Sequence, residues 1–145
     1  MNPTPENTPF SVAVLDETGG GELTAERATE LCAAAFSSRG FELHRVGEVS
    51  VALVSQEQIH ELNLKCREID RPTDVLSFEV DGVYGEMVGE IVISPECASP
   101  EMGIEELVVH GTLHLSGMDH GEDFEGSGMA RIQAAVMGSV QGTEE

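Results

Sequence analysis

Three of the chain's five histidines, His110, His114 and His120, lie within one eleven-residue segment. In a helix, His110 and His114 stand four residues apart, so both imidazoles project from one face and can bind a single ion. Gly117 is expected to end that helix, and His120 follows three residues later on a loop that returns toward the same point. Three neutral nitrogen ligands, with a fourth position left for water or substrate, are typical of catalytic zinc, whereas structural zinc usually takes four protein ligands. The pattern predicts one catalytic zinc ion per chain, against the alternative of two ordinary helix histidines and an unrelated loop histidine.

The residues near these histidines indicate which hydrolytic reactions the predicted metal site could catalyse. Gly111 follows His110, whereas metalloproteases of the H-E-x-x-H type have a glutamate there that acts as general base. Peptide hydrolysis by that route is therefore disfavoured. Glycine inside a helix costs about 1 kcal/mol relative to alanine, so Gly111 is expected to leave space for a close neighbour or for substrate. Asp119 is interpreted either as an acceptor for an imidazole N–H or as a solvated loop carboxylate, and Glu90 is a candidate general base only because it is a carboxylate.

Three of the chain's seven cations lie within seven residues, at Lys65, Arg67 and Arg71. A guanidinium aimed at a phosphate would stabilise the charge that develops during phosphodiester hydrolysis. This segment is therefore the candidate phosphate-binding element. The alternative is a loop whose arginines pair with the neighbouring Glu68 and Asp70.

Composition limits the class of protein. The 145 residues, 40% of them hydrophobic, are enough for one core, which predicts a single domain over residues 1–145 with a loose segment at residues 1–9. The net charge of −20 disfavours attraction to nucleic acids or anionic membranes, and it indicates either a surface suited to high salt or a generically acidic protein. No stretch is leader-like or long enough to span a membrane, so a cytoplasmic location is expected. Cys32, Cys66 and Cys97 are widely spaced and predict no disulfide framework, and Cys32 is expected to be a small buried residue.

The elements that must position these residues follow from periodicity, caps and turn residues. Strands are predicted over residues 10–15, 49–53, 75–80 and 88–93, the last two as a hairpin. Helices are predicted over residues 25–39, 55–65, about 99–116 and about 124–137. The order of strands and helices predicts an α+β domain with a small mixed sheet, in which a zinc-binding helix is followed by a loop ligand.

Four segments resemble one known family. His110-Gly-Thr-Leu-His114-Leu-Ser-Gly-Met-Asp-His120 is similar to the H-G-x-L-H-L-x-G-x-D-H signature of the YbeY family, metal-dependent endoribonucleases of ribosomal RNA maturation. The other three segments are Pro72-Thr-Asp-Val-Leu-Ser-Phe78, similar to P-T-D-V-L-S-F; Leu62-Asn63 with Arg67, similar to L-N-x-x-x-R; and Gly89-Glu90-Ile91, similar to G-D-I.

The resemblance implies an α+β fold and zinc-dependent cleavage of single-stranded RNA, in small-subunit rRNA maturation and ribosome quality control. It implies that His110, His114 and His120 are the metal ligands and that Arg67 is the catalytic cation that contacts phosphate. The partners implied are single-stranded rRNA and the ribosome or its proteins. Two other interpretations remain: a non-enzymatic ribosome assembly factor with a structural metal, docking through its acidic surface, and a metallohydrolase that acts on another phosphoester.

The chain departs from the family pattern at several positions. Glu90 replaces an aspartate, Cys66 stands where an aromatic residue is common, and Gln133 stands where an acid is expected. The segment over residues 95–106 is also short. The charge of −20 would repel RNA, so either high intracellular salt, with a Debye length of about 3 Å at 1 M, or protein partners on the ribosome must offset that repulsion.

Overall fold

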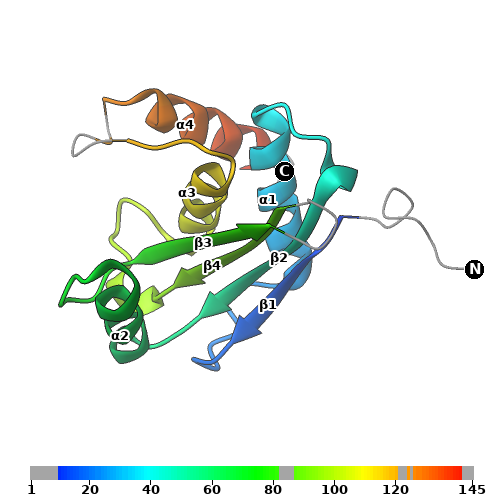
Figure 1. Cartoon of the computed structure of the whole chain (residues 1–145). Helices are drawn as coiled ribbons and strands as arrows, with labels where there is room; N and C mark the ends of the chain where they lie inside the picture. The colour runs from blue at the N-terminus through cyan, green and yellow to red at the C-terminus, as the bar shows by residue number, and fades with distance from the viewer. Residues whose placement is uncertain (1–9, 82–86, 121–123, 125, 142–145) are drawn as a thin grey trace, which may run out of the picture.

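A four-stranded mixed sheet forms the centre of the structure, a computed structural model that describes residues 10–81, 87–120, 124 and 126–141 (Figure 1). Its strands are β1 (Val12–Asp16), β2 (Val46–Leu53), β3 (Val75–Asp81) and β4 (Met87–Ile93). In the order β1-β2-β4-β3, the first three strands are parallel neighbours and β3 pairs antiparallel with β4. The mixed sheet and the hairpin pairing of β3 with β4 are thus confirmed. The predicted loose segment 1–9 and the hairpin turn, residues 82–86, lie outside the described residues.

Four α helices accompany the sheet in the described part of the chain, namely α1 (Ala25–Ser38), α2 (Gln56–Arg67), α3 (Ile104–Leu115) and α4 (Gly128–Gln141). Thr24 caps α1, and a capping box formed by Ser55 and Gln58 begins α2. No helix among the described residues is both long and apolar enough to span a membrane.

Two predicted helix starts are wrong. The segment before α3 does not continue the helix from Ser99, because Pro95–Cys97 forms a short 3-10 helix and Ser99 makes an isolated β-bridge with Met102. Helix α4 begins at Gly128 rather than Phe124, since the Ser127 hydroxyl accepts the N–H of Ala130 at 3.1 Å and so provides the cap. Both errors arise because contacts within turns set these helix starts, and hydrophobic periodicity does not predict such contacts.

The two faces of the sheet carry different helices (Figure 1). Val51, Leu53 and Ile91 on one face join the main core with α1, α3 and α4. Alternate side chains such as Ala52 and Val92 point to the other face, where they pack with Ile59 of α2. Helix α3 therefore crosses one face of β3 and β4, while α2 packs on the other.

Helix α3 approaches the sheet closely at two glycines. A Cβ built on Gly111 would lie 2.7 Å from Ile91 Cγ2 and 3.1 Å from Ser77 Oγ, and one on Gly89 would lie 2.7 Å from Leu115 Cδ1. The Ser77 hydroxyl also donates to the Gly111 carbonyl at 3.0 Å. The space left by Gly111 is thus taken by a close neighbour, the sheet itself.

We expect Gly111→Ala to lower the free energy of unfolding by up to about 2 kcal/mol. Overpacking a filled site typically costs about 1–3 kcal/mol, which exceeds the roughly 1 kcal/mol that alanine gains over glycine in a helix. Gly138→Ala in α4 is the matched control, because its Cβ would meet nothing within 4 Å, and it should stabilise the protein. Urea unfolding measures both, and equal stabilisation by the two substitutions would contradict the close approach of α3.

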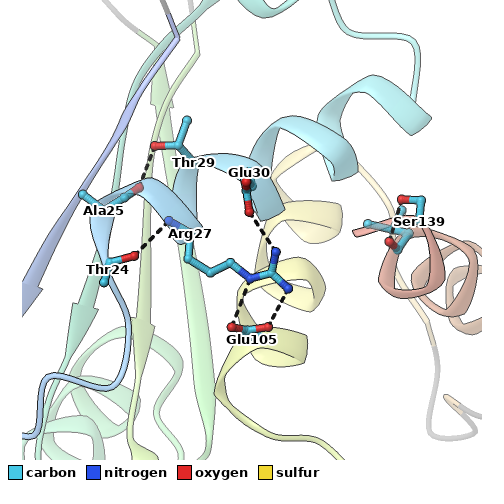
Figure 2. Close-up of polar contacts among 8 residues, drawn as sticks. Thr24, Ala25, Arg27, Thr29, Glu30, Glu105 and Ser139 are labelled. Atoms are coloured by element: carbon cyan, nitrogen blue, oxygen red, sulfur yellow. Dashed lines mark hydrogen bonds and ion pairs between the residues drawn. The ribbon is translucent and has the colours of Figure 1, made fainter. Parts of the chain in front are cut away.

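A bidentate ion pair connects the first turn of α3 to α1. Figure 2 shows the Arg27 guanidinium donating to both carboxylate oxygens of Glu105, at 3.1 and 3.0 Å, and to Glu30 at 2.8 Å. This two-pronged geometry is the strong form of an arginine–carboxylate contact. It helps to hold the helix that carries His110 and His114 in a defined position.

The three cysteines differ in exposure, which makes their reactivity predictable. All are free; Cys32 is buried, Cys97 is half-buried and Cys66 is exposed. Burial raises the pKa of the Cys32 thiol to about 11, so very little thiolate, the reactive form, is present at pH 8. We expect an aromatic disulfide reagent to modify Cys66 rapidly and Cys32 only after unfolding. The rapid phase should disappear in Cys66→Ser, and rapid modification of Cys32 in the folded protein would contradict its burial.

Candidate metal centre

The three histidines predicted as ligands come together at the end of α3. One ring nitrogen from each of His110, His114 and His120 lies within 4.8 Å of the others. The ring centroids of His110 lie 4.9 Å from those of His114 and 5.3 Å from those of His120. Among the described residues this set contains nitrogen donors alone, a donor set that suits zinc and leaves the remaining coordination positions to other groups.

A glycine-dependent turn brings the third histidine back. Gly117 has φ +102°, a left-handed conformation that favours glycine. Its N–H donates to the His114 carbonyl at 3.0 Å, and the Met118 N–H donates to the Leu113 carbonyl at 3.0 Å. These two bonds form a Schellman motif. The chain then reverses toward the helix, so His120 reaches the rings of α3.

The same turn orients His114. Its Nδ1 lies 3.1 Å from the Met118 carbonyl oxygen, which only accepts hydrogen bonds. Nδ1 therefore carries the hydrogen, and the lone pair of Nε2 is left for a ligand role. Asp119 acts on the backbone instead: its carboxylate accepts the N–H of His120 at 2.9 Å.

Burial favours the neutral, metal-binding form of the two helix histidines. It is the main cause that lowers the pKa of His110, and the neighbouring rings of His114 and His120 add to that effect. Burial also lowers the pKa of His114, and the positive charge of Arg67 acts in the same direction. Phe124 packs its ring 4.9 Å from the centroids of both His110 and His120, so an apolar wall covers one side of the cluster.

Arg67 is the last residue of α2 and is exposed. Its positive charge acts on His114 and is one of the lesser causes that lower the pKa of that histidine. The loop that follows is fixed by Asn63, whose buried amide donates to the Arg71 carbonyl at 2.9 Å, and by a hydrogen bond between His60 Nε2 and the Asp70 carboxylate at 2.8 Å. Within the described ranges, neither Arg67 nor Arg71 forms an ion pair with a carboxylate, so the alternative in which Glu68 and Asp70 neutralise them is not supported.

Glu90, the candidate general base, does not join this cluster. Gly89 and Ile91 contact α3, so the alternation of a strand directs the exposed Glu90 to the opposite face. Asp74 is the carboxylate whose charge acts on His110. Asp74 lies within the segment Pro72-Thr-Asp-Val-Leu-Ser-Phe78, where no spacing to another functional residue pointed to it.

Two other contributors were missed at the sequence level. Gln133 is 1% exposed and its side-chain oxygen lies 2.9 Å from His110 Nδ1. The sequence feature that could have indicated it is its spacing: Gln133 lies on the same face of α4 as the buried Met129 and Val136, where an apolar residue is usual. Phe124 stood in the sequence as the expected first residue of a helix, so its contact with the histidines had no local signal.

Known proteins resemble this chain over most of its length. The profile of a family described as "Endoribonuclease YbeY" matches residues 16–141. A protein named "Endoribonuclease YbeY" from Rubrobacter xylanophilus is 69% identical over 135 residues, covering 92% of this chain and 98% of that protein. One of the same name from Desulfitobacterium hafniense is 40% identical over 112 residues, covering 64% of this chain and 71% of the relative. The solution structure of TM1509 from Thermotoga maritima matches with a TM-score of 0.54 and 33% identity, covering 90% and 89% of the two chains.

Proposed function

The chain belongs to the YbeY family of endoribonucleases, and from that premise we propose that it is a zinc-dependent endoribonuclease acting on single-stranded RNA. The proposal includes a role in small-subunit rRNA maturation and ribosome quality control, with the ribosome or its proteins as partners. Three free cysteines, which suit a reducing compartment, support the cytoplasm as its location.

The observation that carries the proposal is the grouping of one ring nitrogen each from His110, His114 and His120 within 4.8 Å. It is supported by the positive charge of Arg67, which acts on His114 and forms no ion pair with any other residue that the structure describes. The histidines would hold one zinc ion. Zinc bound there would supply Lewis-acid polarisation of a phosphoryl oxygen and a water of lowered pKa. Gly111 stands at the position where metalloproteases of the H-E-x-x-H type have their glutamate base. This difference favours a phosphodiester over a peptide as substrate.

The side chains have separable tasks in this proposal. Arg67, exposed at the end of α2, binds a non-bridging phosphate oxygen and stabilises negative charge as it develops. Phe124 excludes water from one side of the histidine rings. The charge of Asp74 acts on His110, so its carboxylate is a candidate to accept a proton or to position a water molecule.

A second function is favoured by the net charge of −20. A non-enzymatic ribosome assembly factor would use that acidic surface to dock on basic ribosomal proteins, and its metal would be structural. The two functions differ in what purified protein does to RNA without a partner.

The deciding experiment measures turnover of a fluorescent single-stranded RNA by purified protein, with a duplex of the same sequence as control. Metal is removed by chelation and restored with zinc, magnesium or manganese in parallel, and the series is repeated up to molar KCl to screen the repulsion between protein and RNA. We expect cleavage of the single strand that depends on zinc. Absence of cleavage, with one zinc bound per chain and an intact fold, would contradict the enzyme and favour the assembly factor.

The ribosomal part of the proposal needs a separate measurement. Co-sedimentation with purified small ribosomal subunits should retain the protein at moderate salt, because its acidic surface is attracted to basic ribosomal proteins. If the protein cleaves free RNA but does not bind small subunits at any salt concentration, the nuclease activity would be supported and the ribosomal partner would be contradicted.

A further inference from the structure

Next to His110 lies a polar chain of three side chains from two helices, of which two are buried and Glu106 is half-buried. His110 Nδ1 on α3 is 2.9 Å from Gln133 Oε1 on α4, and Gln133 Nε2 is 2.8 Å from Glu106 Oε2, one helical turn before His110. Gln133 is 1% exposed and His110 is 8% exposed. Gln133 Nε2 also approaches the sulfur of Met102 at 3.9 Å, a second weak acceptor on the same side.

The far end of this chain determines the direction of every hydrogen bond in it. An ionised carboxylate only accepts hydrogen bonds, so Glu106 must face the NH2 group of Gln133. The amide oxygen then points at His110 and can only accept, so His110 Nδ1 must donate. The hydrogen of the neutral ring is therefore on Nδ1, and the lone pair is on Nε2.

We propose that Gln133 and Glu106 are positioning residues for the metal site: Glu106 fixes the orientation of the Gln133 amide, and Gln133 fixes the ring and tautomer of His110. The inference rests on the metal site proposed above. A buried glutamine alone would not suffice, because its oxygen and nitrogen can exchange places and present a donor to the ring. The Glu106 carboxylate, two hydrogen bonds away from the His110 ring, removes that ambiguity.

His110 and His114 are held in the same tautomer by different acceptor groups. For His114 the backbone carbonyl of Met118 accepts from Nδ1, whereas for His110 the acceptor is a side chain that depends on another side chain. Both histidines of α3 then present Nε2 in one tautomer. An acceptor on the outer nitrogen commonly changes metal affinity by about 10–100-fold when it is removed.

The first test reads the tautomer in metal-free protein by long-range hydrogen–nitrogen NMR of the imidazole rings at a pH where they are neutral. The wild-type His110 should show hydrogen on Nδ1 alone. Glu106→Gln should give a mixture of both tautomers, because an amide at either position can donate or accept. Glu101→Gln, an equal change of charge at an exposed residue just before α3, should leave the single tautomer, and a single tautomer in Glu106→Gln would overturn the assigned role of Glu106.

The second test measures zinc affinity by competition with a chromogenic chelator. Gln133→Met keeps a similar shape without a strong acceptor and should weaken zinc binding by about 10–100-fold, with thermal unfolding used to verify the fold. The double variant Gln133→Glu/Glu106→Gln restores an acceptor for His110 and a donor for that acceptor at unchanged net charge, so it should bind zinc within a few-fold of wild type. Unchanged affinity in Gln133→Met, or loss in the double variant equal to that in Gln133→Met, would overturn the inference.

These readouts separate the inference from the proposed nuclease. The tautomer and zinc measurements need no RNA, so a protein that binds zinc but cleaves nothing still tests them. A wild type that binds no zinc at all would refute the metal site itself, while the tautomer experiment would still report on the hydrogen-bonded chain.

Discussion

His114→Ala is expected to lower RNA cleavage by about 1,000-fold or more, roughly 4 kcal/mol in the free energy of activation. Removing one of three nitrogen donors leaves His110 and His120, a pair too weak to hold a catalytic ion in place. At the proposed zinc site, zinc content should fall well below one per chain, and the stabilisation expected from zinc binding to the folded protein should disappear. Kinetics, metal analysis and thermal unfolding with and without zinc measure these three effects.

The matched control for that variant is His44→Ala, which removes an exposed histidine in the 3-10 helix Leu43–Arg45, outside the cluster. It should cleave RNA and bind zinc as the wild type does. A His114→Ala protein that keeps one zinc at unchanged affinity would show that the ion is held elsewhere. One that keeps its activity without zinc would remove the metal from the mechanism.

Arg67→Ala is expected to reduce turnover of single-stranded RNA by about 100-fold, since a charge-assisted hydrogen bond to a phosphate contributes roughly 1.5–3 kcal/mol. Zinc should remain bound, because Arg67 is not a donor to the ion and its positive charge near His114 opposes a cation. If the guanidinium stabilises the transition state, the loss should appear in kcat. Arg67→Lys should recover only part of it, because an ammonium group carries the charge without the planar donor geometry of a guanidinium.

Arg45→Ala is the control, because it changes the net charge equally while removing an arginine that is 75% exposed and pairs with Glu42. Its turnover should stay within a few-fold of wild type. If Arg67→Ala and Arg45→Ala lower turnover equally, Arg67 contributes only through the net charge of the protein and not through a specific contact with phosphate. Unchanged turnover in Arg67→Ala would remove this residue from the mechanism.

Local sequence signals predicted much of the fold because they act over one or two turns of chain. Thr24, Ser55 and Gly117 end or begin helices through contacts within a few residues, and the alternation in β2 and β4 reflects two buried faces. The starts of α3 and α4 were wrong where turn contacts, at Ser99 with Met102 and at Ser127, replaced helical ones.

The local part of the site could be predicted from residue types and spacing: His110 and His114 on one face of a helix, the glycine turn, and His120 beyond it. The surroundings of these rings depend on contacts between distant segments of the chain. Gln133 reaches His110 from 23 residues away, Phe124 packs against two of the rings, and Glu90 lies on the wrong face of β4. The physical reason is that spacing along one helix or strand fixes which side chains share a face, whereas contacts between elements depend on how those faces pack, which no local periodicity records.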